Sequence, residues 1–489
     1  MKKYKIAILL FYLILTFSCE NYLDKAPISQ FNTGSFYENE EGVLLAVNGA
    51  YNLFKNPYIN YLPQMAEARS DNHSTSYSVY NYTIVSRFND DEVTNICWSA
   101  WQGYYRAITA CNYVLDNIDN VEFTLGEERK IFAKGEVRFL RALAYFDLFR
   151  LFGGIPLVDK VSTPEEVRKT PRATDTEMYK FLIDELKQAA NELPAAWEGN
   201  DIGRATLYAA KGILSRVYLT QKDWNSAKAE LEDIINSGFF ERFSNWEDIW
   251  DDANDNGKEF VFQIQFVSGN IGQGNSYSSE VIPPDISSDE VPFGGDNGYF
   301  YASQDIYDAF SDEDKRRDIT VQKGYKTLTG DVNTSTVWVK KFVVGNATAR
   351  FDFEINWPVL RISDVYLMYA EVLNELNYSS TGQALDILNW NRNRAGLVPL
   401  NSSEVSNQAS FRLAIEKERR LEFAFENIRW FDLVRTNRVF EVVNSFLVAE
   451  TYPDPNNYKV RDHQLLFAIP REVLNRNPDR DYMWQNPGY

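Results

Sequence analysis

The stretch from Arg138 to Val158 reads RFLRALAYFDLFRLFGGIPLV, and it decides the fold class. Apolar residues lie on two flanks of the helix predicted over 127–152, and charged side chains form stripes between these flanks. Gly153, Gly154 and Pro156 end this helix. A helix that is apolar on two flanks packs against neighbours on both sides, as it does inside a stack of helical pairs.

Further helices are predicted on both sides of this stretch. Residues 95–152 read as a helical hairpin with a break at 120–126. Residues 204–237 carry small, aromatic, alanine and large apolar residues at the offsets of a tetratricopeptide repeat, at Ser215, Tyr218, Ala227 and Leu231. Other helices are predicted over 174–193, 363–377, 381–394 and 409–427. We therefore expect a mainly α fold of degenerate tetratricopeptide-like helical repeats, over about 95–237 and 361–440.

Two segments lack this helical period. Residues 239–360 contain runs rich in glycine, asparagine and serine, with short β-like pieces over 260–266 and 336–339. Residues 55–95 have the same character. Because long irregular segments inside a compact body are usually functional, we expect the ligand surface on these two regions, on one face of the helical body. We see no Pro/Gly/Ser-rich linker, which favours a single body over residues 19–489.

The N-terminus has the features of a secretory leader. Three lysines in the first five residues precede the uncharged stretch 6–17, which is shorter than the about 20 residues that a spanning helix needs. Ser18 and Cys19 resemble a bacterial lipoprotein cleavage site. There, residues 1–18 are removed and the acylated Cys19 anchors the mature chain. The alternative is an ordinary signal peptide in which the cysteine is incidental.

The other two cysteines, Cys97 and Cys111, fall in one predicted helix. Their spacing places them about 21 Å apart along that helix. A disulfide needs Cα atoms within about 7 Å, so we predict two buried free thiols.

The charge of the chain excludes several classes of partner. The formal net charge is −19, and a surface this acidic repels nucleic acid and anionic lipid. The two histidines, His73 and His463, are far apart, and no His/Cys cluster has metal-ligand spacing. Walker-type loops, Rossmann fingerprints and serine nucleophile elbows are also missing from the sequence. We therefore expect no metal, no cofactor and no nucleic-acid partner.

Aromatic residues indicate the kind of ligand. Tyr, Phe and Trp make up 15% of the chain, and several lie in polar loops where a core does not need them. Rings stack on the C–H faces of sugars and amides bond their hydroxyls, so this composition suits carbohydrate. Trp98 and Trp101 lie at helical spacing and are assigned to the core.

Five residues are predicted to contact the ligand. Asp71 and Asn72 follow a helical run. Tyr80 belongs to an alternating series with Tyr77 and Tyr82, although alternation also fits a half-buried strand.

The remaining two predicted contacts are Tyr299 and Tyr301, which follow the glycine-rich run 294–298. The alternative for these rings is that they pin the loop.

Several segments resemble the SusD/RagB family of nutrient-uptake lipoproteins. They are Cys19–Pro27, Arg138–Val158, Arg361–Glu371, Asn389–Gly396, Glu418–Arg435, and a C-terminal series at 469–472, 477–478 and 485–489. The resemblance implies an α-helical fold with four tetratricopeptide-like units, docking on a SusC-like TonB-dependent barrel, and glycan capture without chemistry. Asn427 stands where the family usually has glycine, and asparagine tolerates the left-handed backbone that such a turn needs.

An enzymatic reading rests on Glu418, Glu422 and Glu426, which share one helical face. Paired carboxylates about 5–5.5 Å apart could form a retaining glycosidase site. However, arginines crowd this segment, and an arginine lowers the pKa of a neighbouring carboxylate by about 1–3 units, whereas a general acid needs the opposite shift. We therefore expect an ion network that locks the last helices together, and no catalytic residue.

The sequence thus predicts a surface-exposed, lipid-anchored protein of the cell outer membrane that faces the extracellular side. It is expected to bind an oligosaccharide or polysaccharide and to deliver it to a SusC-like transporter. The competing hypotheses are a helical-repeat scaffold for the transporter complex that binds no ligand, and a surface glycosidase.

Overall fold

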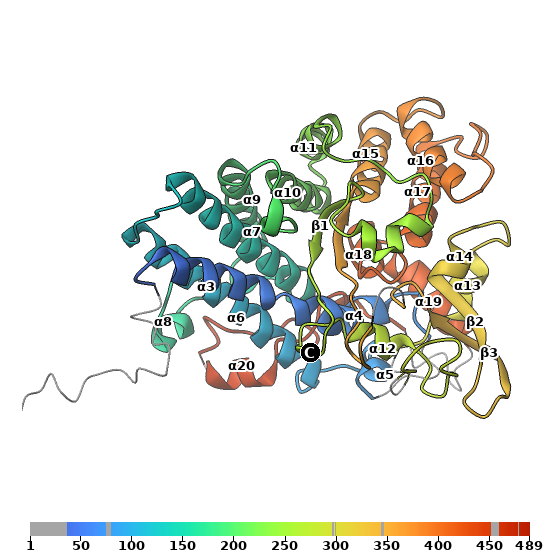
Figure 1. Cartoon of the computed structure of the whole chain (residues 1–489), viewed down its shortest axis with the longest axis horizontal. Helices are drawn as coiled ribbons and strands as arrows, with labels where there is room; N and C mark the ends of the chain where they lie inside the picture. Colours follow the sequence, from blue (N-terminus) through green and yellow to red (C-terminus); the bar gives the residue numbers. More distant parts are fainter. Residues whose placement is uncertain are drawn as a thin grey trace, which may run out of the picture.

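The computed structural model describes residues 37–74, 80–295, 298, 300–343, 347–450, 459–477 and 479–489. Within these ranges the chain is mainly helical, with an arc of long helices on one side and a lobe of short elements on the other (Figure 1). The predicted signal peptide and Cys19 lie outside the described residues, and their roles stay predictions. No helix in the described ranges has the length and apolar character needed to cross a membrane.

The long helices pack in chain order. They are α3 (Glu40–Asn52), α6 (Asn95–Asn117), α7 (Glu127–Phe152), α9 (Asp175–Glu192), α10 (Leu207–Gln221), α11 (Trp224–Asn236), α15 (Ile362–Asn377), α16 (Gln383–Arg394) and α17 (Gln408–Glu422). From α6 to α11 each of these helices packs on the next, α11 packs on α15, and α15 packs on α16 and α17. This serial packing confirms the predicted tetratricopeptide-like architecture.

Shorter helices complete the chain. They are α4 (Leu62–Met65), α5 (Tyr80–Ser86), α8 (Pro164–Arg168), α12 (Tyr277–Val281), α13 (Gln304–Ala309), α14 (Arg317–Thr320), α18 (Arg429–Arg435), α19 (Val439–Ala449) and α20 (Arg471–Arg476). The helix predicted over 409–427 is wrong at its end, because α17 stops at Glu422. Phe425 and Asn427 have φ angles of 68° and 63°, which no α-helix can contain. The left-handed turn expected at Asn427 is confirmed.

Helix α7 packs on both flanks, as its sequence predicts. On one side Arg141 donates to Glu185 of α9 at 2.8 Å. On another, Asp147 accepts from the hydroxyls of Tyr58 and Tyr104 at 3.2 and 3.1 Å. The helix ends at Gly153, whose φ is 72°. Its charged stripes are therefore interior contacts between neighbouring helices.

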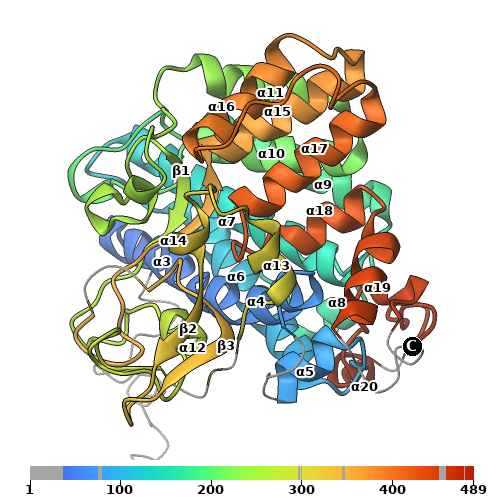
Figure 2. The same cartoon turned by 90° about the vertical axis from the view of Figure 1, so that its right-hand side faces the viewer.

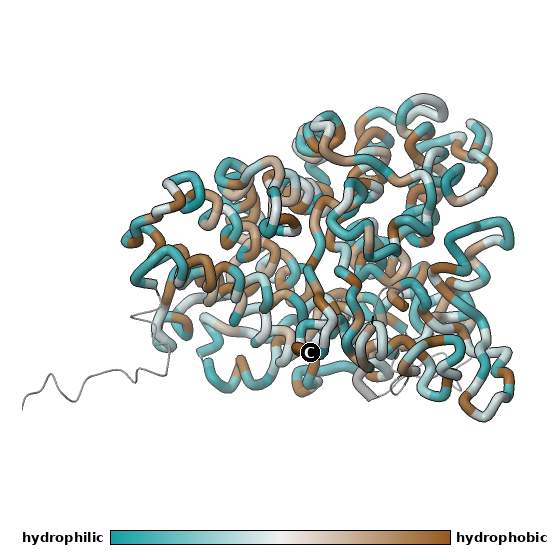
Figure 3. The backbone as a smooth tube through the Cα atoms, in the orientation of Figure 1, coloured by the Kyte–Doolittle hydropathy of each residue, from teal (hydrophilic) through white to brown (hydrophobic). Residues whose placement is uncertain are grey.

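Two antiparallel two-stranded sheets confirm the predicted β-like pieces. Strand β1 (Phe260–Ile264) pairs with β4 (Trp357–Arg361), and β2 (Val321–Lys326) pairs with β3 (Val332–Val339). Both β1 and β4 are entirely buried, and the β1 ring of Phe262 lies 4.8 Å from Phe139 of α7. Apolar segments accordingly run through the middle of the molecule (Figure 3). The β2–β3 hairpin instead belongs to the lobe, where β2 packs on α13 and α14 (Figure 2).

Residues 57–74 are almost entirely buried. Arg69 pairs with Asp90 at 2.7 Å and its guanidinium lies 3.4 Å from the ring centroid of Phe467. Glu67 accepts hydrogen bonds from the backbone N–H groups of Phe425 and Asn427. These long-range contacts make residues 57–74 part of the core, which contradicts their predicted place on the ligand face. The strand considered for the tyrosine series is also wrong, because Tyr80–Ser86 is helical.

The prediction for the two cysteines is confirmed, and the core assignment of the two tryptophans is confirmed for Trp101 only. Cys97 and Cys111 are both buried free thiols of α6, as predicted. Trp101 is buried in the core, whereas Trp98 is only half-buried and lies under the guanidinium of Arg476.

Arg361 is expected to be a major determinant of stability, because it donates to Glu259, Glu422 and Glu426 at 3.1, 3.0 and 2.8 Å inside the core. Arg361→Met removes the cation that these three buried carboxylates share, and leaves them, among the described residues, only Arg316, Arg394 and Lys341 as ion-pair partners. The free energy of unfolding should fall by about 3–5 kcal/mol in chemical denaturation.

The control is Arg412→Met, which removes an exposed pair with Glu375. Its effect should stay below about 1 kcal/mol. Equal effects of the two substitutions would contradict the role assigned to Arg361.

Candidate functional site

The three glutamates considered for catalysis lie inside the protein. Glu418, Glu422 and Glu426 are 1%, 0% and 4% exposed. Glu422 accepts from Arg394 at 2.5 Å and from Arg361 at 3.0 Å. The predicted ion network is therefore confirmed, and it extends beyond the last helices to strand β4 and helix α16.

Burial and the neighbouring arginines shift the pKa values of Glu422 and Glu418 in opposite directions. Burial alone would raise the pKa of Glu422, but Arg394, Arg361 and Arg316 together lower it to about 2. Glu418 departs from the predicted direction, because burial outweighs the attraction of Arg316 and raises its pKa. A carboxylate that stays ionised and never meets solvent cannot serve as a general acid for a glycan.

Asp71 and Asn72 belong to a second buried cluster. Asp71 accepts from Arg429 at 2.8 and 2.9 Å, and Arg420 holds both residues in place. Burial would raise the pKa of Asp71, but the two arginines lower it to about 2. The two side chains are 3% and 0% exposed. Their polar atoms are thus committed to internal partners, and direct ligand contact has no support from this geometry.

Of the three predicted tyrosines, only Tyr301 has a described side chain. Tyr299 and the side chain of Tyr80 lie outside the described residues. Tyr301 is half-buried, forms an isolated bridge with Trp338, and accepts a backbone hydrogen bond from Ser74 at 2.8 Å. This contact brings the segment after Asp71 and Asn72 against the β2–β3 hairpin. Tyr301 thus lies in the lobe, and its contact with a ligand stays a prediction.

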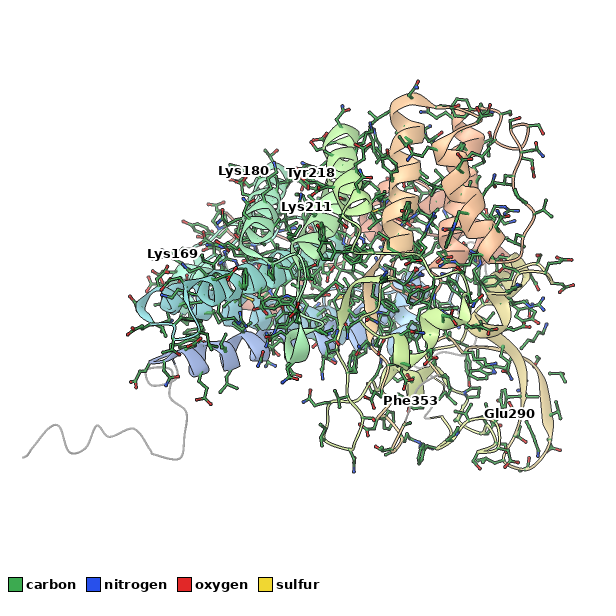
Figure 4. All side chains as sticks on the ribbon, turned by 45° about the horizontal axis from the view of Figure 1, so that its top comes forward. Lys169, Lys180, Lys211, Tyr218, Glu290 and Phe353 are labelled. Atoms are coloured by element: carbon green, nitrogen blue, oxygen red, sulfur yellow. The ribbon has the colours of Figure 1, made fainter. Side chains whose placement is uncertain are left out.

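An open cavity of about 580 Å³ lies in this lobe. Its apolar lining includes Val291, Trp338 and Phe353, and its polar lining includes Glu290, Gln322 and Lys340. Trp338 and Phe353 are only 1% and 4% exposed, so their side chains are held in place by packing at the base of the cavity. Glu290 and Phe353 lie on the lobe, at the other end of the molecule from Lys180 of the helical arc (Figure 4).

Two exposed phenylalanines adjoin this cavity along the chain. Phe293 follows the lining residue Pro292, and Phe351 lies in the turn between the lining residues Ala347 and Phe353. They are 48% and 41% exposed, with φ angles of 67° and 63°. A bulky residue in this region is strained by about 1–3 kcal/mol.

Two other phenylalanines show what normally offsets this strain. Phe88 and Phe425 have φ angles of 56° and 68°, but both are buried and gain core contacts. Phe293 and Phe351 gain less burial for a similar strain. Strained residues that the core does not explain concentrate at functional sites. Neither residue was predicted from the sequence, because backbone angles cannot be inferred from composition. The only local signal was the Phe293–Gly294–Gly295 turn.

A second cavity, of about 310 Å³, lies within the helical arc. Its charged lining is internally paired: Arg216 bonds Asp364, and Arg419 bonds Asp432. These charged groups are therefore already paired within the protein. Among the residues that the structure describes, no group of three or more His, Cys, Asp or Glu side chains could hold a metal ion.

Comparison with known proteins identifies the family of this chain. The signature of the SusD family matches residues 317–489, and that of the family described as starch-binding, associating with outer membrane, matches residues 21–219. This chain belongs to the SusD/RagB family. SusD-like protein P25 of Formosa agariphila is 27% identical over 98% of both chains. The starch-binding protein SusD of Bacteroides thetaiotaomicron is 26% identical over 50% of this chain and 47% of that protein.

Solved structures of SusD-like proteins share the fold. One from Bacteroides fragilis is 26% identical, covers 95% of this chain and 100% of its own, and superimposes with a TM-score of 0.77. A laminarin-binding SusD-like protein is 23% identical, covers 93% of this chain and 100% of its own, and has a TM-score of 0.76. Two of these relatives are named for binding starch and laminarin. That this chain has no catalytic residue stays an expectation.

A hydrolysis assay tests this expectation. Because Glu418, Glu422 and Glu426 are buried and paired, the purified protein should release no reducing ends from any glycan that it binds. Release of reducing ends that Glu422→Gln abolishes, in a variant that still unfolds cooperatively, would restore the glycosidase hypothesis.

Proposed function

We propose that this SusD-like protein captures an oligosaccharide or polysaccharide outside the cell and delivers it to a SusC-like TonB-dependent transporter. Relatives named for starch and laminarin binding support a glycan as the ligand. The observation that carries the proposal is the pair of exposed, backbone-strained phenylalanines beside the lobe cavity. Flat rings of this kind stack on sugar C–H faces, while amides such as that of Gln322 bond hydroxyls.

The lobe is suited to binding without large rearrangement. Its floor is packed, and a backbone hydrogen bond links it to the buried segment at Ser74. A rigid, preformed surface lowers the entropy that is lost on binding. Tyr301, Tyr299 and Tyr80 remain proposed contacts at the edge of this surface, whereas Asp71 and Asn72 would act by positioning the segment that leads to it.

The proposed location follows from the N-terminus and the family. Residues 1–18 would be cleaved, and acyl chains on Cys19 would hold residues 19–489 at the outer membrane on its extracellular side. The helical repeats, over about 95–237 and 361–440, would pack against the transporter. The variable ligand face would come from the lobe within 239–360 and from the part of 55–95 that reaches it. Tethering raises the local concentration of glycan at the pore, so micromolar to millimolar affinity suffices.

The scaffold hypothesis is the main alternative. It assigns the whole protein to transporter assembly and gives the lobe no ligand. The exposed rings of Phe293 and Phe351 favour glycan capture, since a scaffold has no need for strained aromatic residues beside an open cavity. The glycosidase hypothesis has less support, because its candidate carboxylates are buried.

Replacing the rings of Phe293 and Phe351 should lower glycan affinity without lowering stability. Phe293→Gly and Phe351→Gly relieve left-handed strain while they remove the stacking surface. Glycan affinity, measured by calorimetry with the best ligand from a glycan array, should fall at least tenfold. The melting temperature should stay the same or rise.

Phe239→Ala is the matched control, because Phe239 is 43% exposed but lies just after α11, away from the lobe. It should leave affinity unchanged. Unaltered binding by both glycine variants would refute the stacking role, and an intact transporter complex that binds no glycan or peptide would support the scaffold.

The anchor can be tested separately. Cys19→Ala removes the only proposed acylation site, so metabolic labelling with a fatty acid should be lost and the protein should leave the outer-membrane fraction. Cys111→Ala is the control and should keep the label. Retention of label in the Cys19 variant would contradict the anchor.

A further inference from the structure

We infer that the glycan captured by this protein is anionic, and that Lys340 and Arg350 bind its carboxylate or sulfate groups. This inference rests on the proposed function and names the class of ligand. It rests on two cations in and beside the lobe cavity that have no carboxylate partner among the described residues.

Lys340 lines the cavity and is half-buried. Its backbone is fixed by a hydrogen bond to the carbonyl of Thr320 at 3.0 Å. In the described ranges of the chain, no carboxylate oxygen lies within 4.0 Å of its ammonium. Its neighbour Lys341 shows the usual alternative, because it is buried and bonded to Glu426 at 2.5 Å. Lys340 therefore presents an uncompensated positive charge to the cavity.

Arg350 supplies a second cation. It is exposed and lies one residue before the strained Phe351. It also lies against the turn that carries Phe293, since a β-carbon placed on Gly294 would be 3.9 Å from Arg350 Nη2. The described residues offer its guanidinium no carboxylate within 4.0 Å either. A guanidinium can bind a planar carboxylate or a sulfate bidentately, next to a ring that stacks on the same sugar.

Carboxylates near the cavity are already engaged. Glu290 lines the cavity but accepts the backbone N–H of Lys326 at 2.6 Å. Asp352, in the same turn as Arg350, accepts from the backbone N–H groups of Gly269 and Asn270. Glu290 would repel an anionic ligand on its own side of the cavity, which directs an acidic group towards Lys340. In a chain of net charge −19, such local cations decide whether an acidic sugar can bind at all.

The test pairs charged oligosaccharides with neutral counterparts of the same backbone. One pair is a uronic-acid oligomer with its carboxyl-reduced form, and the other is a sulfated oligomer with its desulfated form. Calorimetric titration of the full mature chain should show at least tenfold tighter binding of the charged member of one pair. The preferred pair identifies carboxylate or sulfate as the group.

Lys340→Met and Arg350→Gln should remove this preference while they leave the affinity for the neutral member within about twofold. Lys417→Met is the matched control, because Lys417 is exposed, lies on α17 and forms no ion pair within the part of the chain that the structure describes. It should retain the preference.

Equal or tighter binding of the neutral members, or a preference that survives both substitutions, would overturn the inference and leave the proposed function standing. Absence of binding by every oligosaccharide would overturn both.

Discussion

The structure depends on a buried cluster of charges centred on Arg361. This guanidinium lies at the end of β4 and holds Glu259, next to β1, together with Glu422 of α17 and Glu426 of the turn after it. Because charges in the interior are destabilising unless they are fully paired, the segments that supply them can occupy only one arrangement. The cluster therefore fixes the central sheet, the last repeat and the turn in a single geometry.

A short series of contacts connects this charge cluster to the lobe. Lys341 is anchored in the cluster by Glu426, while the adjacent Lys340 faces the cavity. Glu67 holds the turn at Asn427 and also accepts from Asn72, which leads to the segment bonded to Tyr301. The lobe is thus attached to the buried charge cluster, and these contacts hold the segments that carry its exposed rings and cations. Binding by such a surface needs no catalytic group and little conformational change.

Much of the fold could be predicted because amphipathic helices have apolar residues at a regular helical spacing in the sequence. The two apolar flanks of α7 are such a local signal, and the structure bears them out. The end of α17 could not be placed, since its left-handed turn is imposed by Glu67, about 350 residues earlier in the chain. Local pattern carries no information about such a partner.

The candidate site shows the same limit more sharply. Asp71 and Asn72 look like loop residues in the sequence, but Arg420 and Arg429 from distant helices bury them. Phe293 has an unremarkable local sequence, and only its exposure and backbone angle distinguish it. The residues that line the lobe cavity come from distant segments, so their assembly depends on tertiary contacts that the local sequence does not record.

The most direct test is a crystal structure of the mature protein with a bound oligosaccharide, compared with the unliganded protein. The account predicts a sugar ring stacked on Phe293 or Phe351, at the mouth of the lobe cavity, with the side chains around Arg361 unmoved. A glycan held in the cavity of the helical arc, or one that contacts Glu418 or Glu422, would contradict it.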